Sequence, residues 1–185
     1  GGGLPAKYKE TDTPSQFSEY AAAIQKRCPD LFAPDILLCT EFGRSIHASC
    51  GWVASKVEYV VDNDSSKSTL LTHLGADMFL RKAYCPDDWH HQLSICDSTG
   101  QLREGANKQY QVAGPLCFAG DYLSRDVSLP ADICKGDRLI IHDAGAYTFS
   151  MWSLYNSRQF PAIIGYEEEN AEDGVKFQCL RRRQS

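Results

Sequence analysis

From about Gly51 to its C-terminus, the chain is a succession of short runs of strand-forming residues separated by turn sequences. Turns are indicated at Asp97–Gly100, Lys135–Asp137 and Glu172–Gly174, where Gly, Asp and Ser gather. This punctuation is typical of an antiparallel barrel or sandwich, so we predict a mainly β fold. The predicted strands are Trp52–Val61, Ser68–Leu74, His91–Cys96, Gln109–Val112, Arg138–His142, Ala162–Tyr166 and Val175–Leu180.

The first of these runs predicts which side chains face the interior. Residues on one face of a strand recur every second position. In Trp52–Val61 this spacing places Val53, Val57, Tyr59 and Val61 on one face, which we expect to be buried.

The first 50 residues have a different pattern. Thr13 and Pro14 predict the N-cap and first turn of a helix, and Gln16 stands where a capping box needs it. Apolar residues then recur at helical spacing as far as Cys28. The continuous apolar run Ile36–Cys39 predicts a strand buried on both faces of a parallel sheet. A glycine loop, a helix and a buried strand suit the closing elements of a (β/α)₈ barrel, so we predict two domains, 1–50 and 51–185.

Charge and cysteine usage narrow the possible functions. The 185 residues carry a formal net charge of −5, which does not favour nucleic acid or an anionic membrane as partner. No apolar stretch approaches the length of a membrane span, and no signal peptide is visible. The eight cysteines include no CxxC pair and no Cys/His spacing typical of zinc, so we predict no metal site. These features favour a reducing compartment, and we predict a cytoplasmic protein.

Four short segments contain residues suited to chemistry, although each has an ordinary structural explanation. Gly1-Gly2-Gly3 offers backbone N–H groups to a phosphate, but a terminal glycine tract is often a linker. Glu41 and Arg44 follow the predicted buried strand, where they form either a cofactor site or a local ion pair. Cys117 follows a Gly-Pro turn and is either a presented thiol or a structural cysteine. Tyr147 follows Asp143-Ala144-Gly145-Ala146 at the end of a predicted strand. Its hydroxyl either donates a hydrogen bond to a phosphate, or its ring simply packs at the strand end.

Taken together and in this order, the segments resemble the C-terminal portion of the pyridoxal-phosphate-dependent ornithine/diaminopimelate/arginine decarboxylases. The resemblance runs from Gly1 to about Tyr166 and is nearest to the diaminopimelate branch. It implies a Greek-key-like antiparallel β-barrel preceded by the last βα elements of the cofactor-binding barrel. Two positions depart from the family motifs: Phe42 stands where proline is usual, and Phe118 replaces an acidic residue that contacts the distal amine of the substrate.

The resemblance also implies a role for each candidate residue. Cys117 enters the active site of the partner subunit and helps direct protonation, which makes it the catalytic candidate. Arg81 resembles an arginine that binds the substrate carboxylate, Tyr84 lies in the same segment, and Asp121 matches a later acidic position of the cysteine motif. The predicted cofactor-binding residues are Gly1, Gly2, Gly3, Glu41, Gly43, Arg44 and Tyr147.

The implied reaction removes the α-carboxylate of a small amino-acid substrate through a Schiff base with pyridoxal 5'-phosphate, in lysine or polyamine biosynthesis. Family members of this kind are homodimers with active sites at the interface. Their Schiff-base lysine lies upstream of the glycine loop, and no lysine here stands in a similar context. The chain alone is therefore expected to be inactive. The alternative is a catalytically dead paralogue that binds or regulates an active decarboxylase through the dimer surface.

Overall fold

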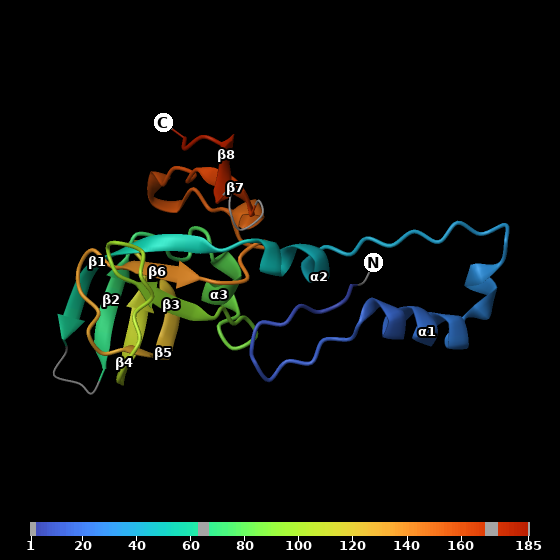
Figure 1. The fold of residues 1–185 in the computed structure, drawn as a ribbon, viewed down its shortest axis with the longest axis horizontal. Helices are drawn as coiled ribbons and strands as arrows, with labels where there is room; N and C mark the ends of the chain where they lie inside the picture. The colour runs from blue at the N-terminus through green and yellow to red at the C-terminus, as the bar shows by residue number, and fades with distance from the viewer. Residues whose placement is uncertain (1–2, 63–66, 169–173, 185) are drawn as a thin grey trace.

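The computed structural model describes residues 3–62, 67–168 and 174–184. Figure 1 shows three parts: a barrel-like sheet, a hairpin beside it, and an arm, residues 13–43, that projects away from both. The sheet contains β1 (Val53–Asp62), β2 (Ser68–Thr72), β3 (Leu93–Cys96), β4 (Asn107–Ala113), β5 (Tyr122–Pro130) and β6 (Arg138–Ile141). The hairpin pairs β7 (Ile163–Glu168) with β8 (Val175–Arg181).

The helices are short and lie mostly outside the sheet. Five of them join strands or directly precede the sheet, and α1 with the following η1 forms the end of the arm. They are α1 (Phe17–Arg27), η1 (Pro29–Phe32), α2 (Arg44–His47), η2 (Ala48–Cys50), α3 (Leu80–Tyr84), η3 (Phe149–Met151) and η4 (Tyr155–Ser157). Within the described residues, no helix is long and apolar enough to cross a membrane.

The sheet curls into a nearly closed barrel. Its strand order is β3-β6-β1-β2-β4-β5, and β3 and β5, at the two ends of this order, contact each other. The mainly β prediction is thus confirmed. One pair differs from the antiparallel expectation, because β2 and β4 run parallel. Between them the chain crosses through α3 and β3, and such a crossover returns the chain in the same direction.

The interior of the barrel contains the hydrophobic core. Val57, Leu70, Tyr110 and Leu139 come from β1, β2, β4 and β6 and are fully buried together. Tyr110 also satisfies its polar end, because its hydroxyl donates to the Ala131 carbonyl at 3.2 Å. The apolar face of every central strand therefore meets the same core.

The predicted face of β1 is correct for its first half and wrong for the second. Val57 is 0% exposed, but Tyr59 is 57% exposed and Val61 lies at the surface. The cause is a β-bulge, since the pairing with β2 shifts register between Val57 and Tyr59. One extra residue reverses the alternation, so that Val60 packs against the core instead.

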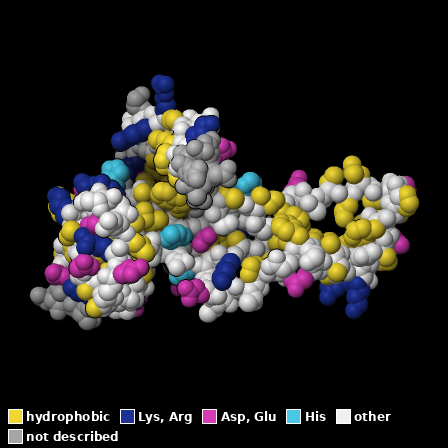
Figure 2. All heavy atoms as spheres, viewed as in Figure 1, with side chains coloured by type: hydrophobic (Ala, Val, Ile, Leu, Met, Phe, Trp, Pro, Cys, Tyr) yellow, Lys and Arg dark blue, Asp and Glu magenta, His cyan; other side chains and the backbone are white. Residues whose placement is uncertain are grey.

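The arm differs most from the sequence expectation. Helix α1 begins at Phe17 rather than after Thr13, and Gln16 caps it by donating its backbone N–H to the Glu19 carboxylate at 2.9 Å. The predicted strand Ile36–Cys39 is irregular and unpaired in the described structure, and Leu37 is 88% exposed. A parallel strand of this kind forms only between neighbouring strands, and the described residues supply none beside it. Figure 2 shows hydrophobic side chains exposed along this arm.

Strand β5 is absent from the sequence prediction. Leu123 and Leu129 are buried and Val127 lies on the same face, which is the spacing of a strand. Arg125 interrupts that apolar face, because its guanidinium lies over the Tyr122 ring at the surface. Because the residues around Arg125 are polar, the sequence pattern did not indicate β5, the strand that completes the barrel.

We predict that Leu70→Ala, made in residues 1–185, lowers the free energy of unfolding by about 2–5 kcal/mol, because it leaves a cavity in the barrel core. The matched control is Leu37→Ala on the exposed arm, which should change it by less than about 0.5 kcal/mol. Urea denaturation followed by circular dichroism measures both variants. Equal destabilisation by the two changes would contradict the exposed position of Leu37.

Candidate functional site

Two arginines from separate segments share one aromatic surface. Arg44 begins α2, and Arg81 lies in α3. Each guanidinium carbon lies 4.7 Å from the centre of the Trp89 ring. The same carbons lie 5.4 Å (Arg44) and 4.3 Å (Arg81) from the centre of the Tyr147 ring. We call Arg44, Arg81, Trp89 and Tyr147 the two-arginine cluster.

The charge of this cluster is uncompensated. Among the described residues, neither Arg44 nor Arg81 forms an ion pair with a carboxylate. The Nε of Arg81 donates to the sulfur of Met151 at 3.3 Å, a weak acceptor. The rings of Trp89 and Tyr147 stabilise the cations through their negative faces without neutralising them. Two like charges held side by side in this way attract an anionic group.

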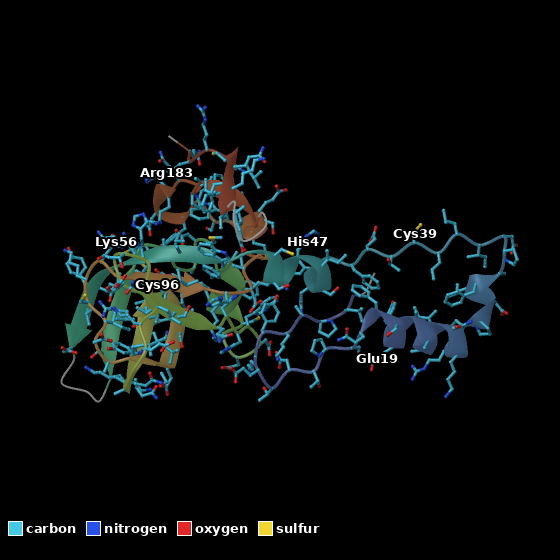
Figure 3. The ribbon with its side chains drawn as sticks, in the orientation of Figure 1. Glu19, Cys39, His47, Lys56, Cys96 and Arg183 are labelled. Atoms are coloured by element: carbon cyan, nitrogen blue, oxygen red, sulfur yellow. The ribbon has the colours of Figure 1, made fainter. Side chains whose placement is uncertain are left out.

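Close backbone contact brings Tyr147 to Arg44. A side chain at Gly145 would lie 1.8 Å from the His47 carbonyl oxygen, so only glycine lets this turn approach α2. The Gly145 N–H then donates to the Ala48 carbonyl at 3.0 Å. Tyr147 itself has a φ of 58°, a left-handed conformation that a bulky residue rarely adopts. Figure 3 shows His47 at this junction between the arm and the barrel.

Gly43, which directly precedes Arg44, also lies close to Tyr147. A Cβ atom at Gly43 would stand 3.8 Å from the Tyr147 hydroxyl, so the backbone before Arg44 runs beside that hydroxyl. The structure therefore brings together four of the predicted site residues: Gly43, Arg44, Arg81 and Tyr147. Gly1 and Gly2 lie outside the described residues, as does the predicted turn at Glu172-Asp173, and Gly3 is exposed.

Two residues of the site region were missed by sequence reasoning. Trp89 is buried and supports both arginines, and Tyr8 packs edge-on against it with ring centres 5.7 Å apart. Neither belongs to a recognised motif. The available signals were a tryptophan in an otherwise polar segment and a tyrosine shortly after the glycine tract.

The polar groups around the cluster are suited to a phosphate-bearing cofactor. The Tyr8 hydroxyl and the Ser45 hydroxyl are buried without a hydrogen-bond partner, and Ser45 directly follows Arg44. Burial raises the pKa of Tyr8 and also that of the nearby Asp143 carboxyl. Guanidinium groups and protonated hydroxyls are both donors, and phosphate oxygens are acceptors. The donor groups of the cluster are thus chemically compatible with the oxygens of a phosphate.

Cys117 lies in a separate turn that η4 fixes in place. Its backbone N–H donates to the Asn156 side-chain oxygen at 3.0 Å, and its carbonyl accepts from the Tyr155 hydroxyl at 2.9 Å. The thiol is exposed. In the described residues, no hydrogen bond, ion pair or ring contact joins Cys117 to the two-arginine cluster.

Asp121 has a structural position rather than a surface one. It is 3% exposed, and its carboxylate accepts backbone N–H groups from Leu116 at 2.6 Å and Ala76 at 2.7 Å. Burial raises its pKa, which these two hydrogen bonds partly oppose. One carboxylate oxygen thus holds the backbone of the cysteine turn and the other holds the segment after β2, while contact of Asp121 with a substrate stays a prediction.

The remaining candidates are exposed. Glu41 precedes α2 at the surface, and Tyr84 ends α3 with its side chain exposed. Phe42, between Glu41 and Arg44, packs against Phe17 and Tyr20 of α1, each with ring centres 5.3 Å apart. The residue that stands where the family has proline thus packs against α1 within the arm.

Other features of the surface do not coincide with the cluster. Hollows of about 280 and 430 Å³ adjoin the residues that precede β7, and both are lined by His73, Leu74 and Pro161. Their linings contain none of the predicted site residues. In the described part of the chain, no three His, Cys, Asp or Glu side chains are grouped as metal ligands.

Comparison with known proteins relates this geometry to characterised enzymes. Residues 17–145 match the family model described as the C-terminal sheet domain of pyridoxal-dependent decarboxylases. Diaminopimelate decarboxylase of Pseudomonas aeruginosa is 31% identical over 185 residues, which cover 100% of this chain and 40% of that protein. The enzyme of Methanothermobacter thermautotrophicus is 34% identical over 168 residues, covering 89% of this chain and 37% of that protein.

Solved structures agree in fold. A crystal structure of diaminopimelate decarboxylase matches with a TM-score of 0.83 and 28% identity, covering 100% of this chain and 44% of that one. The Helicobacter pylori enzyme, complexed with L-lysine, matches with a TM-score of 0.77 and 26% identity over 99% of this chain and 41% of that one. The chain thus spans about 40% of the length of the relatives it matches. It belongs to the pyridoxal-dependent Orn/DAP/Arg decarboxylase family and corresponds to its C-terminal portion.

Proposed function

We propose that the chain is the C-terminal part of a pyridoxal-phosphate-dependent amino-acid decarboxylase of the diaminopimelate type. The observation that carries this proposal is the two-arginine cluster, in which Arg44 and Arg81 lie over Trp89 and Tyr147 without a carboxylate partner. The substrate and the cofactor both bear anionic groups, so uncompensated guanidiniums are the expected means of holding them. The similarity to diaminopimelate decarboxylases over the whole chain supports the same class.

The roles follow from what each residue can contact. Arg44 and Tyr147 would bind the phosphate of the cofactor, with the backbone of Gly1–Gly3, and Gly43 keeps the approach to Tyr147 open. Arg81 would bind the α-carboxylate of the amino acid, with Tyr84 at the end of the same helix. Glu41 would face the pyridine nitrogen and keep it protonated. When bound, the cofactor supplies an electron sink for the bond that breaks at the α-carbon.

Cys117 would act in a neighbouring subunit. Its exposed thiol, on a turn held by Tyr155 and Asn156, is suited to enter the site of a second copy and help deliver a proton. Asp121 supports this function indirectly, because it holds the Leu116 N–H beside the cysteine. We therefore propose a homodimer with active sites at the interface. A cytoplasmic location, and the lack of a nucleic-acid or membrane partner, stay predictions.

We propose that residues 1–50 complete the cofactor-binding barrel and that residues 51–185 form the β-barrel domain. The exposed Ile36, Leu37 and Leu38 support this division, since such an apolar run belongs between neighbouring strands. The lysine that holds the cofactor would lie in the preceding part of that barrel.

A catalytically dead paralogue that regulates an active decarboxylase is the second candidate. The observation that favours it is Phe118, whose ring packs edge-on against Tyr155 with ring centres 6.5 Å apart, at the position of the family's amine-binding acid. A phenyl ring cannot pair with an ammonium group as a carboxylate does, although it can contact a cation through its face.

We predict that the whole enzyme gains one pyridoxyl adduct by intact mass after treatment with pyridoxal phosphate and borohydride, and that it decarboxylates meso-diaminopimelate. Arg44→Gln should raise the Kd for pyridoxal phosphate about 10-fold or more, because a hydrogen bond to a charged group is lost. Arg182→Gln, on the exposed C-terminal segment, is the control and should leave the Kd unchanged. A whole enzyme that forms the adduct but releases no CO₂ would favour the regulatory paralogue.

We also predict that Leu37→Ala destabilises the whole enzyme by about 2–4 kcal/mol, although it costs almost nothing in residues 1–185 alone. The reason is that the proposed barrel would bury the side chain that is exposed here. Chemical denaturation of both proteins gives the comparison. A negligible effect in both would argue against assigning residues 1–50 to the barrel.

A further inference from the structure

Buried polar atoms without a partner are rare in proteins, and one of them here lies beside the two-arginine cluster. Among the described residues, the buried side-chain atoms that lack a hydrogen bond are the Tyr8 hydroxyl, the Ser45 hydroxyl and the Nε of Arg103. The Arg103 atom is nevertheless 2.7 Å from a carboxylate oxygen of Asp137 and is satisfied as an ion pair. Of the two remaining atoms, the Tyr8 hydroxyl adjoins the two-arginine cluster, because the Tyr8 ring contacts Trp89.

The position of Tyr8 is fixed from several sides. Its ring lies edge-on to Trp89 and His91, with centres 5.7 and 5.8 Å away. Its backbone N–H donates to the Asp12 carboxylate at 3.0 Å, and Leu4 anchors the same segment by being buried. The hydroxyl therefore cannot turn into solvent without breaking these contacts.

We infer that Tyr8 is a ligand-binding residue of the two-arginine cluster and that its hydroxyl donates a hydrogen bond to an anionic oxygen of the bound molecule. This inference rests on the proposed function. The oxygen belongs either to the phosphate of pyridoxal phosphate or to the α-carboxylate of the amino acid, and both offer the same acceptor chemistry. Because burial raises the pKa of Tyr8, the hydroxyl keeps its proton near neutral pH and remains a donor.

A purely structural role does not explain the hydroxyl. The contacts that the ring makes with Trp89 and His91 would be equally available to phenylalanine. Without a ligand, the Tyr8 hydroxyl only destabilises the folded protein, because it gives up its hydrogen bonds to water and gains no new partner. A bound ligand that accepts a hydrogen bond from the Tyr8 hydroxyl explains why an unfavourable buried group is present.

The experiment compares Tyr8→Phe with Tyr110→Phe in the whole enzyme. Tyr110 is the matched control because its buried hydroxyl has a partner, the Ala131 carbonyl, and lies in the barrel core. Tyr8→Phe should raise the Kd of the ligand that its hydroxyl contacts, either pyridoxal phosphate or L-lysine, about 10-fold. It should leave the melting temperature unchanged or higher. Tyr110→Phe should lower the melting temperature and leave the Kd unchanged. These opposite signatures separate binding from folding.

Equilibrium titration with pyridoxal phosphate, pyridoxal and L-lysine identifies which ligand oxygen accepts the hydrogen bond from Tyr8. A loss of affinity for pyridoxal phosphate but not for pyridoxal assigns the hydroxyl to the phosphate. A loss for L-lysine with unchanged cofactor affinity assigns it to the carboxylate. Unchanged affinity for all three probes overturns the inference while the proposed function stands. If the unmodified enzyme binds no pyridoxal phosphate, both the proposed function and this inference are wrong.

Discussion

The close contact between the Gly145 turn and α2 is the constraint on which the candidate site depends. Gly145 approaches the His47 carbonyl too closely for any side chain, and a Cβ at Gly51 would lie 2.8 Å from the Cα of Gly145. Because this junction is so tight, Tyr147 reaches the Arg44 guanidinium although the two residues are far apart in sequence. The left-handed backbone at Tyr147 is part of the same arrangement, since it directs the ring back toward α2. Any substitution that opened the junction would separate the phenol from the arginine.

The sequence predicted the parts of the fold that depend on local pattern and missed those that depend on partners. Alternation and turn residues identify β1 and β6 with small errors at their ends. A β-bulge is set by the pairing strand, so the reversal at Tyr59 could not be read from β1 alone. The run Ile36–Cys39 has the composition of a buried strand, but composition does not supply neighbouring strands. Strand β5 had the right spacing, and Arg125 obscured it.

The same distinction holds for the site. The family resemblance pointed to Arg44, Arg81 and Tyr147, and the structure brings these three residues together. The resemblance did not identify Trp89, whose role is to support two cations, or Tyr8, whose hydroxyl is notable only because it is buried without a partner. Asp121 shows what a motif leaves out. Its position in a motif suggested substrate binding, which stays a prediction, but the motif gave no sign of its burial or of its two backbone hydrogen bonds.

The two departures from the family motifs have different physical consequences. Phe42 packs between Phe17 and Tyr20, so its replacement of proline is compensated by contacts within the arm and leaves Arg44 in the cluster. Phe118 has no such neutral explanation, because it places a ring beside Tyr155 where the family has an acid. The groups proposed for the phosphate and the α-carboxylate, Arg44 and Arg81, lie together despite these departures, and the Phe118 position is the one that bears on the proposed distal amine. The distal end of the substrate is therefore where the proposed decarboxylase and the regulatory paralogue differ, since a carboxylate pairs with an ammonium group and a phenyl ring does not.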